Sequence, residues 1–103
     1  MYKIAFFVPE NVSEVVKSAM FNAGAGRIGN YDHCSFETIG VGQFRALAGA
    51  TPSIGTVGEL EKVRELKVEM VCEDALIREV LLALIKNHPY EMPAYDIIKL
   101  SDI

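Results

Sequence analysis

A glycine-rich stretch from Gly24 to Cys34 follows a segment with helical periodicity, and this order constrains the fold more than any other feature of the chain. In dinucleotide-binding folds a similar glycine pattern closes a strand-to-helix turn, and the helix that begins there binds pyrophosphate at its N-terminus. Here the apolar residues before Gly24 recur at helical spacing instead: Val12, Val15, Val16, Ala19, Met20 and Ala23. We therefore expect Gly24 just beyond a helix end, where glycine adopts a left-handed conformation, and disfavour a nucleotide fingerprint.

The first half of the chain predicts a strand, a helix and a second strand. Residues 2–8 are rich in β-forming side chains. Asn11 is positioned to cap the helix that follows, and Glu14, three residues later, to bond back to that cap. A second strand is expected from about Cys34 to Val41.

The second half predicts a strand, a helix and a last strand. From Val63 to Cys72 apolar side chains alternate with charged ones, which indicates a strand with one buried face. Glu73 and Asp74 are expected to cap a helix with a broad apolar stripe, which Pro89 ends. Tyr95 to Leu100 supplies the last strand. This order predicts a ferredoxin-like α+β sandwich, a four-stranded antiparallel sheet with two helices on one face.

Composition restricts the classes of partner. Residues 1–103 form one domain by length, and the net charge of -4 comes without a Lys/Arg cluster, which disfavours nucleic acid. No apolar run approaches the roughly 20 residues that cross a bilayer, so no membrane partner is expected. Cys34 and Cys72 match neither a disulfide framework nor a zinc motif. We therefore expect two reduced thiols in a cytoplasmic protein.

The first strand predicts self-association, and a long connection is consistent with it. The first strand is apolar on both faces, and two helices can cover only one of them. One face carries Tyr2, Ile4, Phe6 and Val8, and the other carries Ala5 and Phe7. Residues 40–58 are rich in glycine yet contain several apolar side chains, so they form either a functional loop or a hairpin arm packed on a neighbour.

Five motifs in combination resemble the inserted domain of the YqfO, or Nif-three-like, metal-binding proteins, and they span nearly the whole chain. The motifs are Gly24–Tyr31, Gly40–Arg45, Gly49–Gly55, Val68-Glu69 and His88–Asp96. The resemblance implies a PII/CutA-like fold, which is trimeric in those families. It does not extend to the lobes that hold the family's two-metal centre, and the two histidines of this chain are too few for such a site.

A small anionic ligand is one candidate partner. Arg27 and Arg45 are expected to meet the anion in a cleft between subunits, as the nucleotide is bound in the PII proteins that the fold resembles. Surface ion pairs are the alternative role for both arginines. The candidate ligand-binding residues are Arg27, Gly29, Tyr31, Arg45, His88, Tyr90 and Glu91.

A divalent metal ion is the other candidate. His33 and Cys34 are adjacent soft ligands, and they suit copper or zinc if a second chain adds another ligand. His88 and Glu91 offer an imidazole and a carboxylate around a proline-fixed turn. The alternatives are structural: a loop histidine beside a buried thiol, and a rigid helix exit in which His88 favours the helix dipole and Tyr90 packs on the sheet. The candidate metal ligands are His33, Cys34, His88 and Glu91.

No arrangement of residues indicates catalysis. Glu65 and Glu69 share a predicted strand face with Lys67 between them, which suggests a ladder of charges more than an acid-base pair. The sequence therefore favours a non-enzymatic, oligomeric small-ligand-binding or signalling module, expected as a homotrimer. The alternative is a CutA-like divalent-metal-binding protein.

Overall fold

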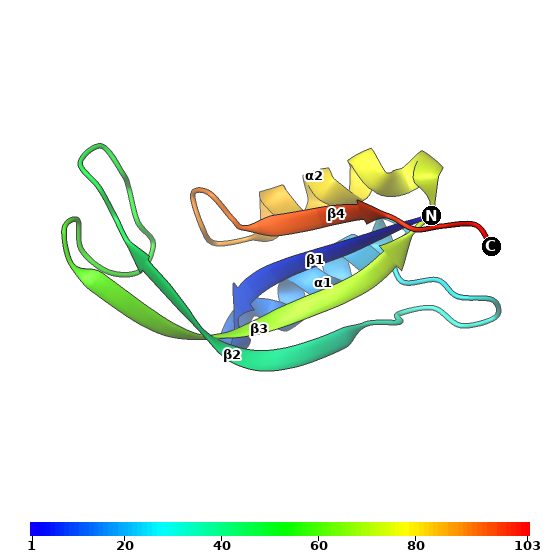
Figure 1. The fold of residues 1–103 in the computed structure, drawn as a ribbon, viewed down its shortest axis with the longest axis horizontal. Helices are drawn as coiled ribbons and strands as arrows, with labels where there is room; N and C mark the ends of the chain where they lie inside the picture. The colour runs from blue at the N-terminus through cyan, green and yellow to red at the C-terminus, as the bar shows by residue number, and fades with distance from the viewer.

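The computed structural model describes residues 1–103. The elements are β1 (Tyr2–Pro9), α1 (Ser13–Asn22), β2 (Phe36–Arg45), β3 (Leu60–Cys72), α2 (Ile77–Asn87) and β4 (Tyr95–Lys99), and 3-10 turns η1 (Glu10–Val12) and η2 (Asp74–Leu76) precede the two helices. The strands form one antiparallel sheet in the order β2-β3-β1-β4, and both helices lie on one face of it (Figure 1). The predicted ferredoxin-like plan is confirmed. Neither helix has the length and apolar character that crossing a membrane requires.

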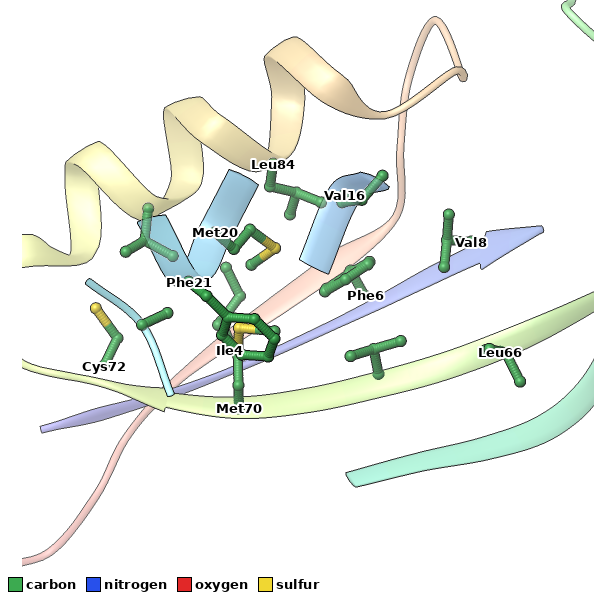
Figure 2. Close-up of a cluster of buried hydrophobic side chains, with 13 residues drawn as sticks. Ile4, Phe6, Val8, Val16, Met20, Phe21, Leu66, Met70, Cys72 and Leu84 are labelled. Carbon is green, nitrogen blue, oxygen red and sulfur yellow. The ribbon is translucent and has the colours of Figure 1, made fainter. Parts of the chain in front are cut away.

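The register of the sheet places the core between the strands and the helices. Opposed residues of antiparallel strands share a face, and β1 sets Ile4 opposite Met70 and Phe6 opposite Val68. Figure 2 shows Ile4, Phe6 and Met70 on the helical side of the sheet, near Met20 of α1. Burying each large apolar side chain stabilises the fold by about 1.5–3 kcal/mol. The 13 core residues are Ile4, Phe6, Val8, Val16, Met20, Phe21, Ala25, Leu66, Val68, Met70, Cys72, Val80 and Leu84.

Gly24 lies immediately beyond α1 and its φ is +110°, as predicted from the helical pattern before it. The Gly24 N–H donates to the Phe21 carbonyl at 3.0 Å, and the Ala25 N–H donates to the Met20 carbonyl at 3.1 Å. These two bonds are those of a Schellman motif, which satisfies the last carbonyls of a helix. The glycine pattern therefore begins as a helix terminator.

The predicted helix caps are wrong. A 3-10 turn precedes α1, so Asn11 lies before the helix and gives no side-chain cap, while the Ser13 hydroxyl donates to the Glu10 carbonyl at 3.0 Å. Glu14 pairs with Lys17 at 3.0 Å instead of bonding back to a cap.

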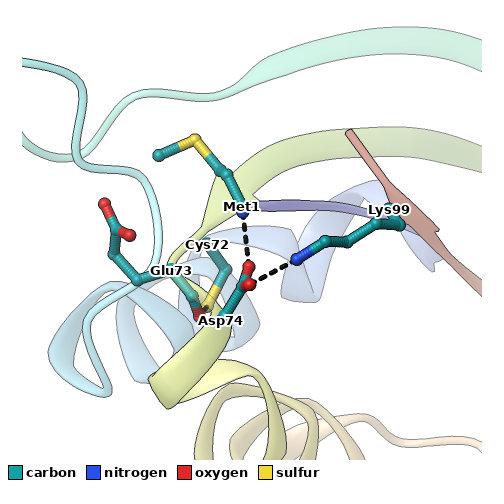
Figure 3. A network of polar contacts seen from close by, with 5 residues as sticks. All are labelled: Met1, Cys72, Glu73, Asp74 and Lys99. Atoms are coloured by element: carbon teal, nitrogen blue, oxygen red, sulfur yellow. Dashed lines mark hydrogen bonds and ion pairs between the residues drawn. The ribbon is translucent and has the colours of Figure 1, made fainter. Parts of the chain in front are cut away.

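The second predicted cap fails for a similar reason, because 3-10 turn η2 separates Asp74 from the start of α2. The Asp74 carboxylate binds the Met1 amino group and the Lys99 ammonium group, and so links three chain segments (Figure 3). Hydrogen bonds from Lys99 and from the Met1 amino group lower the pKa of Asp74.

Strands β2 and β3 are longer than predicted, and their ends form an arm. The sequence predicts strands over 34–41 and 63–72, whereas pairing of β2 with β3 continues to Arg45 opposite Leu60. Strand β1 pairs with β3 only as far as Glu65, so residues 40–64 project beyond the rest of the sheet as a hairpin, hereafter the arm (Figure 1). The glycine-rich connection expected over 40–58 is thus largely part of this arm.

The open face of the sheet mixes apolar and charged side chains. Ala5 lies opposite Glu69 on one side and Asp96 on the other, and Phe7 lies opposite Lys67. Charged side chains therefore border the two apolar residues of β1. The two-sided apolar pattern of the first strand is therefore real, and the neighbouring strands add the exposed Phe36 and Ile98 to the same face.

Candidate functional site

The structure divides the predicted site residues between opposite ends of the sheet. Arg27, Gly29, Tyr31, His33 and Cys34 lie on the connection between α1 and β2. The remaining candidates lie on the arm and on the connection between α2 and β4 (Figure 1); they are Arg45, His88, Tyr90 and Glu91. One chain therefore does not bring all the candidates together.

The glycine-rich connection forms a tight turn with a charged tip. Ile28 and Tyr31 exchange two backbone hydrogen bonds of 2.9 and 3.0 Å, and Gly29, with a φ of +57°, lies between them. Arg27 and Tyr31 are exposed beside this turn. Neither Arg27 nor Arg45 has a carboxylate partner, so the surface ion pairs considered for them do not form within the chain.

His33 and Cys34 lie where the backbone bends before β2 begins. His33 has a φ of +55°, its ring packs on Phe21 with centroids 4.8 Å apart, and its Nδ1 is 3.2 Å from an Asp32 carboxylate oxygen. The Cys34 thiol lies 3.6 Å from the Asp32 carbonyl oxygen, to which it donates. The chain forms no group of three His, Cys, Asp or Glu side chains suited to a metal ion. A metal on this connection would therefore need a ligand from a second chain.

His88 is buried just beyond the end of α2 and makes hydrogen bonds with its backbone and with both ring nitrogens. Its backbone N–H donates to the Leu84 carbonyl at 2.9 Å. The ring Nδ1 accepts the Tyr90 N–H at 3.1 Å, so Nε2 carries the proton that is donated to the Phe7 carbonyl at 2.7 Å. Burial lowers the pKa of His88. Both ring nitrogens are used within the chain, which is the geometry of the rigid helix exit.

A groove of about 570 Å³ lies between the arm and the connection that follows His88. Its volume is within the roughly 300–1,000 Å³ of small-molecule sites. It includes three of the predicted ligand-binding residues, Arg45, Tyr90 and Glu91, and most of the other side chains that line it are apolar. The apolar side chains are Phe7, Phe44, Ala46, Leu47, Ala50, Pro52, Ile54, Met92 and Ala94.

The floor of the groove holds a buried carboxylate. The Tyr90 hydroxyl donates to Glu65 Oε2 at 2.8 Å, and only 9% of Glu65 is exposed. Burial and the neighbouring Glu65 carboxylate raise the pKa of Tyr90. A Cβ atom on Gly42 would lie 1.7 Å from Glu65 Oε1, so glycine leaves the space that this carboxylate occupies.

Two further contacts join the arm to the turn after α2. The Thr51 N–H donates to Glu91 Oε2 at 2.9 Å. The rings of Phe44 and Tyr90 lie with centroids 6.2 Å apart and tilted by 56°, a geometry typical of interacting aromatic pairs. A hydrogen bond and an aromatic contact therefore hold the arm against the turn after α2.

Sequence reasoning missed Glu65 and Gly42 as parts of this site. The alternation of β3 does place Glu65 on the same face as Glu69 and Lys67, as the predicted ladder of charges requires. Glu65 is nevertheless buried, because the turn after α2 brings Tyr90 over it. No local signal in β3 marks this contact, which joins residues 25 positions apart.

Comparison with known proteins identifies close relatives for nearly the whole chain, although no protein-family model matches it. The chain is 50% identical over 95 residues to the GTP cyclohydrolase 1 type 2 homolog of Bacillus subtilis, covering 92% of this chain and 26% of that protein. It is 50% identical over 98 residues to the protein of the same name from Mycobacterium tuberculosis, covering 95% of this chain and 26% of that protein. The chain thus spans about a quarter of the length of these curated relatives.

Solved structures also match nearly the whole chain. A Bacillus cereus protein related to NIF3 superposes with a TM-score of 0.83 and 40% identity, over 98% of this chain and 26% of that one. CutA from Xylella fastidiosa superposes with a TM-score of 0.70 and 16% identity, over 98% of this chain and 84% of that one. The periplasmic divalent cation tolerance protein CutA from Archaeoglobus fulgidus gives 0.69 and 15%, over 99% and 86% of the two chains. At these identities the two CutA proteins share the fold alone.

Proposed function

We propose that this chain is an oligomeric module of the cytoplasm that binds a small ligand and catalyses no reaction. The chain is homologous, over nearly its whole length, to one segment of the Nif-three-like proteins, as its motifs predicted. The relatives' name refers to a cyclohydrolase, but the chain spans only a quarter of their length. That activity is therefore not part of the proposal.

The groove between the arm and the turn after α2 is the observation that carries this proposal. It combines apolar walls with a few polar groups, Glu65, Tyr90 and Glu91, whose positions are fixed by hydrogen bonds. Small-molecule sites typically have this composition, because apolar area supplies affinity while a few fixed polar groups set orientation. The hydroxyl–carboxylate pair of the groove, Tyr90 with Glu65, has a tyrosine whose pKa is raised, which disfavours its ionisation to a nucleophile and so favours binding over catalysis.

Assembly into a homotrimer is the second part of the proposal. Arg27 and Arg45 lie at opposite ends of the sheet, so only two different subunits can bring them to one ligand. The similarity to the CutA fold and the exposed Phe36 and Ile98 side chains on the open face of the sheet support self-association. In the proposed assembly, the glycine-rich turn of one subunit closes the groove of the next, and the two unpaired arginines bind an anionic part of the ligand.

Native mass spectrometry of gently purified protein tests both parts in one spectrum. The expected result is a trimer that carries the extra mass of a retained small molecule. A monomer without extra mass would contradict both the assembly and the shared cleft. A double variant, Arg27→Ala with Arg45→Ala, should keep the trimer and lose any retained anion, while a variant that binds the anion unchanged would remove the arginines from the site.

A divalent-metal-binding protein of CutA type is the second candidate. The exposed pair of Asp32 and His33 supports it, since their facing atoms lie 3.2 Å apart, and a structural neighbour is named for divalent cation tolerance. Because one chain offers no third ligand, the site would form between subunits. Calorimetric titration with Zn²⁺ separates the candidates: His33→Ala should abolish metal binding, whereas the double arginine variant should not change it.

A further inference from the structure

Two carboxylates that line the groove each have one oxygen without a hydrogen-bond partner in the chain. Glu65 Oε2 accepts the Tyr90 hydroxyl, but Oε1 has no partner in the chain. Glu91 Oε2 accepts the Thr51 N–H, and its other oxygen also has no partner. The hydroxyl of Tyr90 and the N–H of Thr51 are thereby used as donors. At these two carboxylates the groove therefore offers two hydrogen-bond acceptors to a ligand.

The charges of the side chains that line the groove also favour a cationic ligand group. Two carboxylates, Glu65 and Glu91, line the groove, whereas its only cationic side chain, Arg45, is exposed and pairs with neither of them. Glu65 is 91% removed from solvent, since only 9% of it is exposed. A carboxylate so placed gains most from a partner that is itself cationic, because water screens the interaction less there.

The walls indicate the rest of the ligand. Leu47 and Met92 are 68% and 85% exposed although both line the groove, and Phe44 and Tyr90 add two aromatic rings. A flat apolar group between them would cover side chains that otherwise face water. Ring-to-ring contacts with Phe44 or Tyr90 would add to the affinity.

We propose that the part of the ligand that enters this groove is an apolar, preferably aromatic, group carrying one ammonium or guanidinium group, which binds Glu65 at the floor and Glu91 at the rim. This inference rests on the proposed function, because it names the chemical class that the same groove accepts. An anionic part of the ligand, if present, lies on the exposed side of the groove that Arg45 lines, away from Glu65.

Three probes of similar size and different charge test the inference: 2-phenylethylamine, 2-phenylethanol and phenylacetate. Each is titrated into ¹⁵N-labelled protein while the amide shifts of Gly42, Phe44 and Tyr90 are followed. The amine should shift these amides with a Kd at least about tenfold below that of the alcohol, since a charged hydrogen bond adds about 1.5–3 kcal/mol, and phenylacetate should bind more weakly than both. Equal binding of amine and alcohol, or preference for phenylacetate, would overturn the charge assignment while groove binding stands. Absence of shifts with all three probes would overturn both the inference and the groove as the ligand site.

A matched set of isosteric variants identifies the carboxylate. Glu65→Gln keeps an acceptor for Tyr90 but removes the charge, so amine affinity should fall to within about threefold of that of the alcohol, the remainder coming from Glu91, and alcohol affinity should stay unchanged. Glu91→Gln on the exposed rim should lower amine affinity by about threefold, because exposed ion pairs contribute less, and it serves alone if Glu65→Gln fails to fold. Glu79→Gln, exposed on α2 and outside the groove, is the control. Unchanged amine affinity in both groove variants would overturn the inference.

Discussion

Gly42 and Glu65 make up one packing unit at the residue scale. The two lie on neighbouring strands, and the Glu65 carboxylate occupies the volume that a side chain on Gly42 would take. The carboxylate also accepts a hydrogen bond from the Tyr90 hydroxyl. The position of Glu65 at the floor of the groove therefore depends on the lack of a side chain at Gly42. Gly40, two residues earlier on the same strand, has open space around the position of its missing Cβ.

This contrast gives a paired substitution. Gly42→Ala should displace the Glu65 carboxylate, break its bond with Tyr90 and lower the free energy of unfolding by about 1–3 kcal/mol, the usual cost of overpacking. Gly40→Ala should be neutral or stabilise the fold by up to about 1 kcal/mol, because alanine restricts the unfolded chain. Urea denaturation measures both, and equal effects of the two substitutions would show that Glu65 does not depend on the space at Gly42.

His88 predicts a dependence of stability on pH. Burial lowers its pKa in the folded protein below the value of about 6.5 expected in the unfolded chain. As the pH falls through this range, the unfolded chain takes up a proton before the folded protein does, so the free energy of unfolding decreases. The neutral ring is required because a protonated Nδ1 can no longer accept the Tyr90 N–H.

The measurement compares wild type and His88→Gln by urea denaturation at pH 7.5 and 5.5. Wild type should be less stable at pH 5.5, and the variant should lose that part of the dependence, because glutamine does not titrate. His33 is present in both proteins, so its contribution cancels in the comparison. An identical pH dependence in the two proteins would show that His88 titrates normally in the fold.

At the scale of elements, Lys17 joins α1 to the edge strand β2. Its ammonium group pairs with Glu37 of β2 at 2.6 Å and with Glu14 of α1 at 3.0 Å, and only 8% of the residue is exposed. Burial alone lowers the pKa of Lys17, but the hydrogen bonds with Glu37 and Glu14 outweigh it, and the pKa is raised. The contact holds the base of the arm's first strand against the helical layer.

The two carboxylates should differ in their contribution. Glu37→Gln weakens the bond between α1 and β2 and should cost about 0.5–1 kcal/mol of unfolding free energy, at the upper end for partly exposed pairs. Glu14→Gln should have almost no effect, because the Glu14 side chain is 80% exposed and that of Glu37 is 36% exposed. Thermal unfolding at low and at 1 M salt checks this difference, which should shrink at high salt. A larger loss in Glu14→Gln would place the important pair within α1 instead.

The types of element could be predicted from the sequence, but several of their ends could not. Alternation over 63–72 and helical spacing before Gly24 are local patterns, and both give the correct element. The predicted caps are wrong because 3-10 turns precede both helices. The arm extends β2 to Arg45 through pairing with β3, a contact that neither strand encodes alone.

The candidate site shows the same limit. The motif that begins at His88 drew attention to Tyr90 and Glu91, and both line the groove. Glu65 gave no such signal, because its burial results from a turn that arrives from the far end of α2. Residues that belong to one connection could be grouped from the sequence, whereas a partner on a distant strand could not.

At the scale of the whole molecule, the arm is the element least attached to the core. The chain extends 46 Å along its longest axis and about half as far, 25 and 24 Å, along the others, and the arm projects from one end (Figure 1). None of the 13 core residues lies within residues 40–64, and the first core residue of β3 is Leu66. The core and the arm are therefore separable in stability.

Replacing residues 46–59 by Asn-Gly tests this separation. The substitution joins Arg45 to Leu60, which are already paired, by a two-residue turn suited to a hairpin. The shortened chain should keep its circular dichroism spectrum and, within about 1 kcal/mol, its free energy of unfolding, because loop length contributes little. It should lose binding of 2-phenylethylamine, since Leu47, Ile54 and the Thr51 bond to Glu91 are removed.

The same variant also separates assembly from folding. If the arm packs on a neighbouring subunit, light scattering after size exclusion should show a folded monomer in place of the proposed wild-type trimer. If the arm only encloses the groove, the shortened chain should keep the wild-type assembly and no longer bind the amine. A shortened chain that unfolds would instead show that the arm stabilises the core, which contradicts the separation drawn from the buried residues. The arm thus links the two proposed properties, and a single replacement distinguishes which of them depends on it.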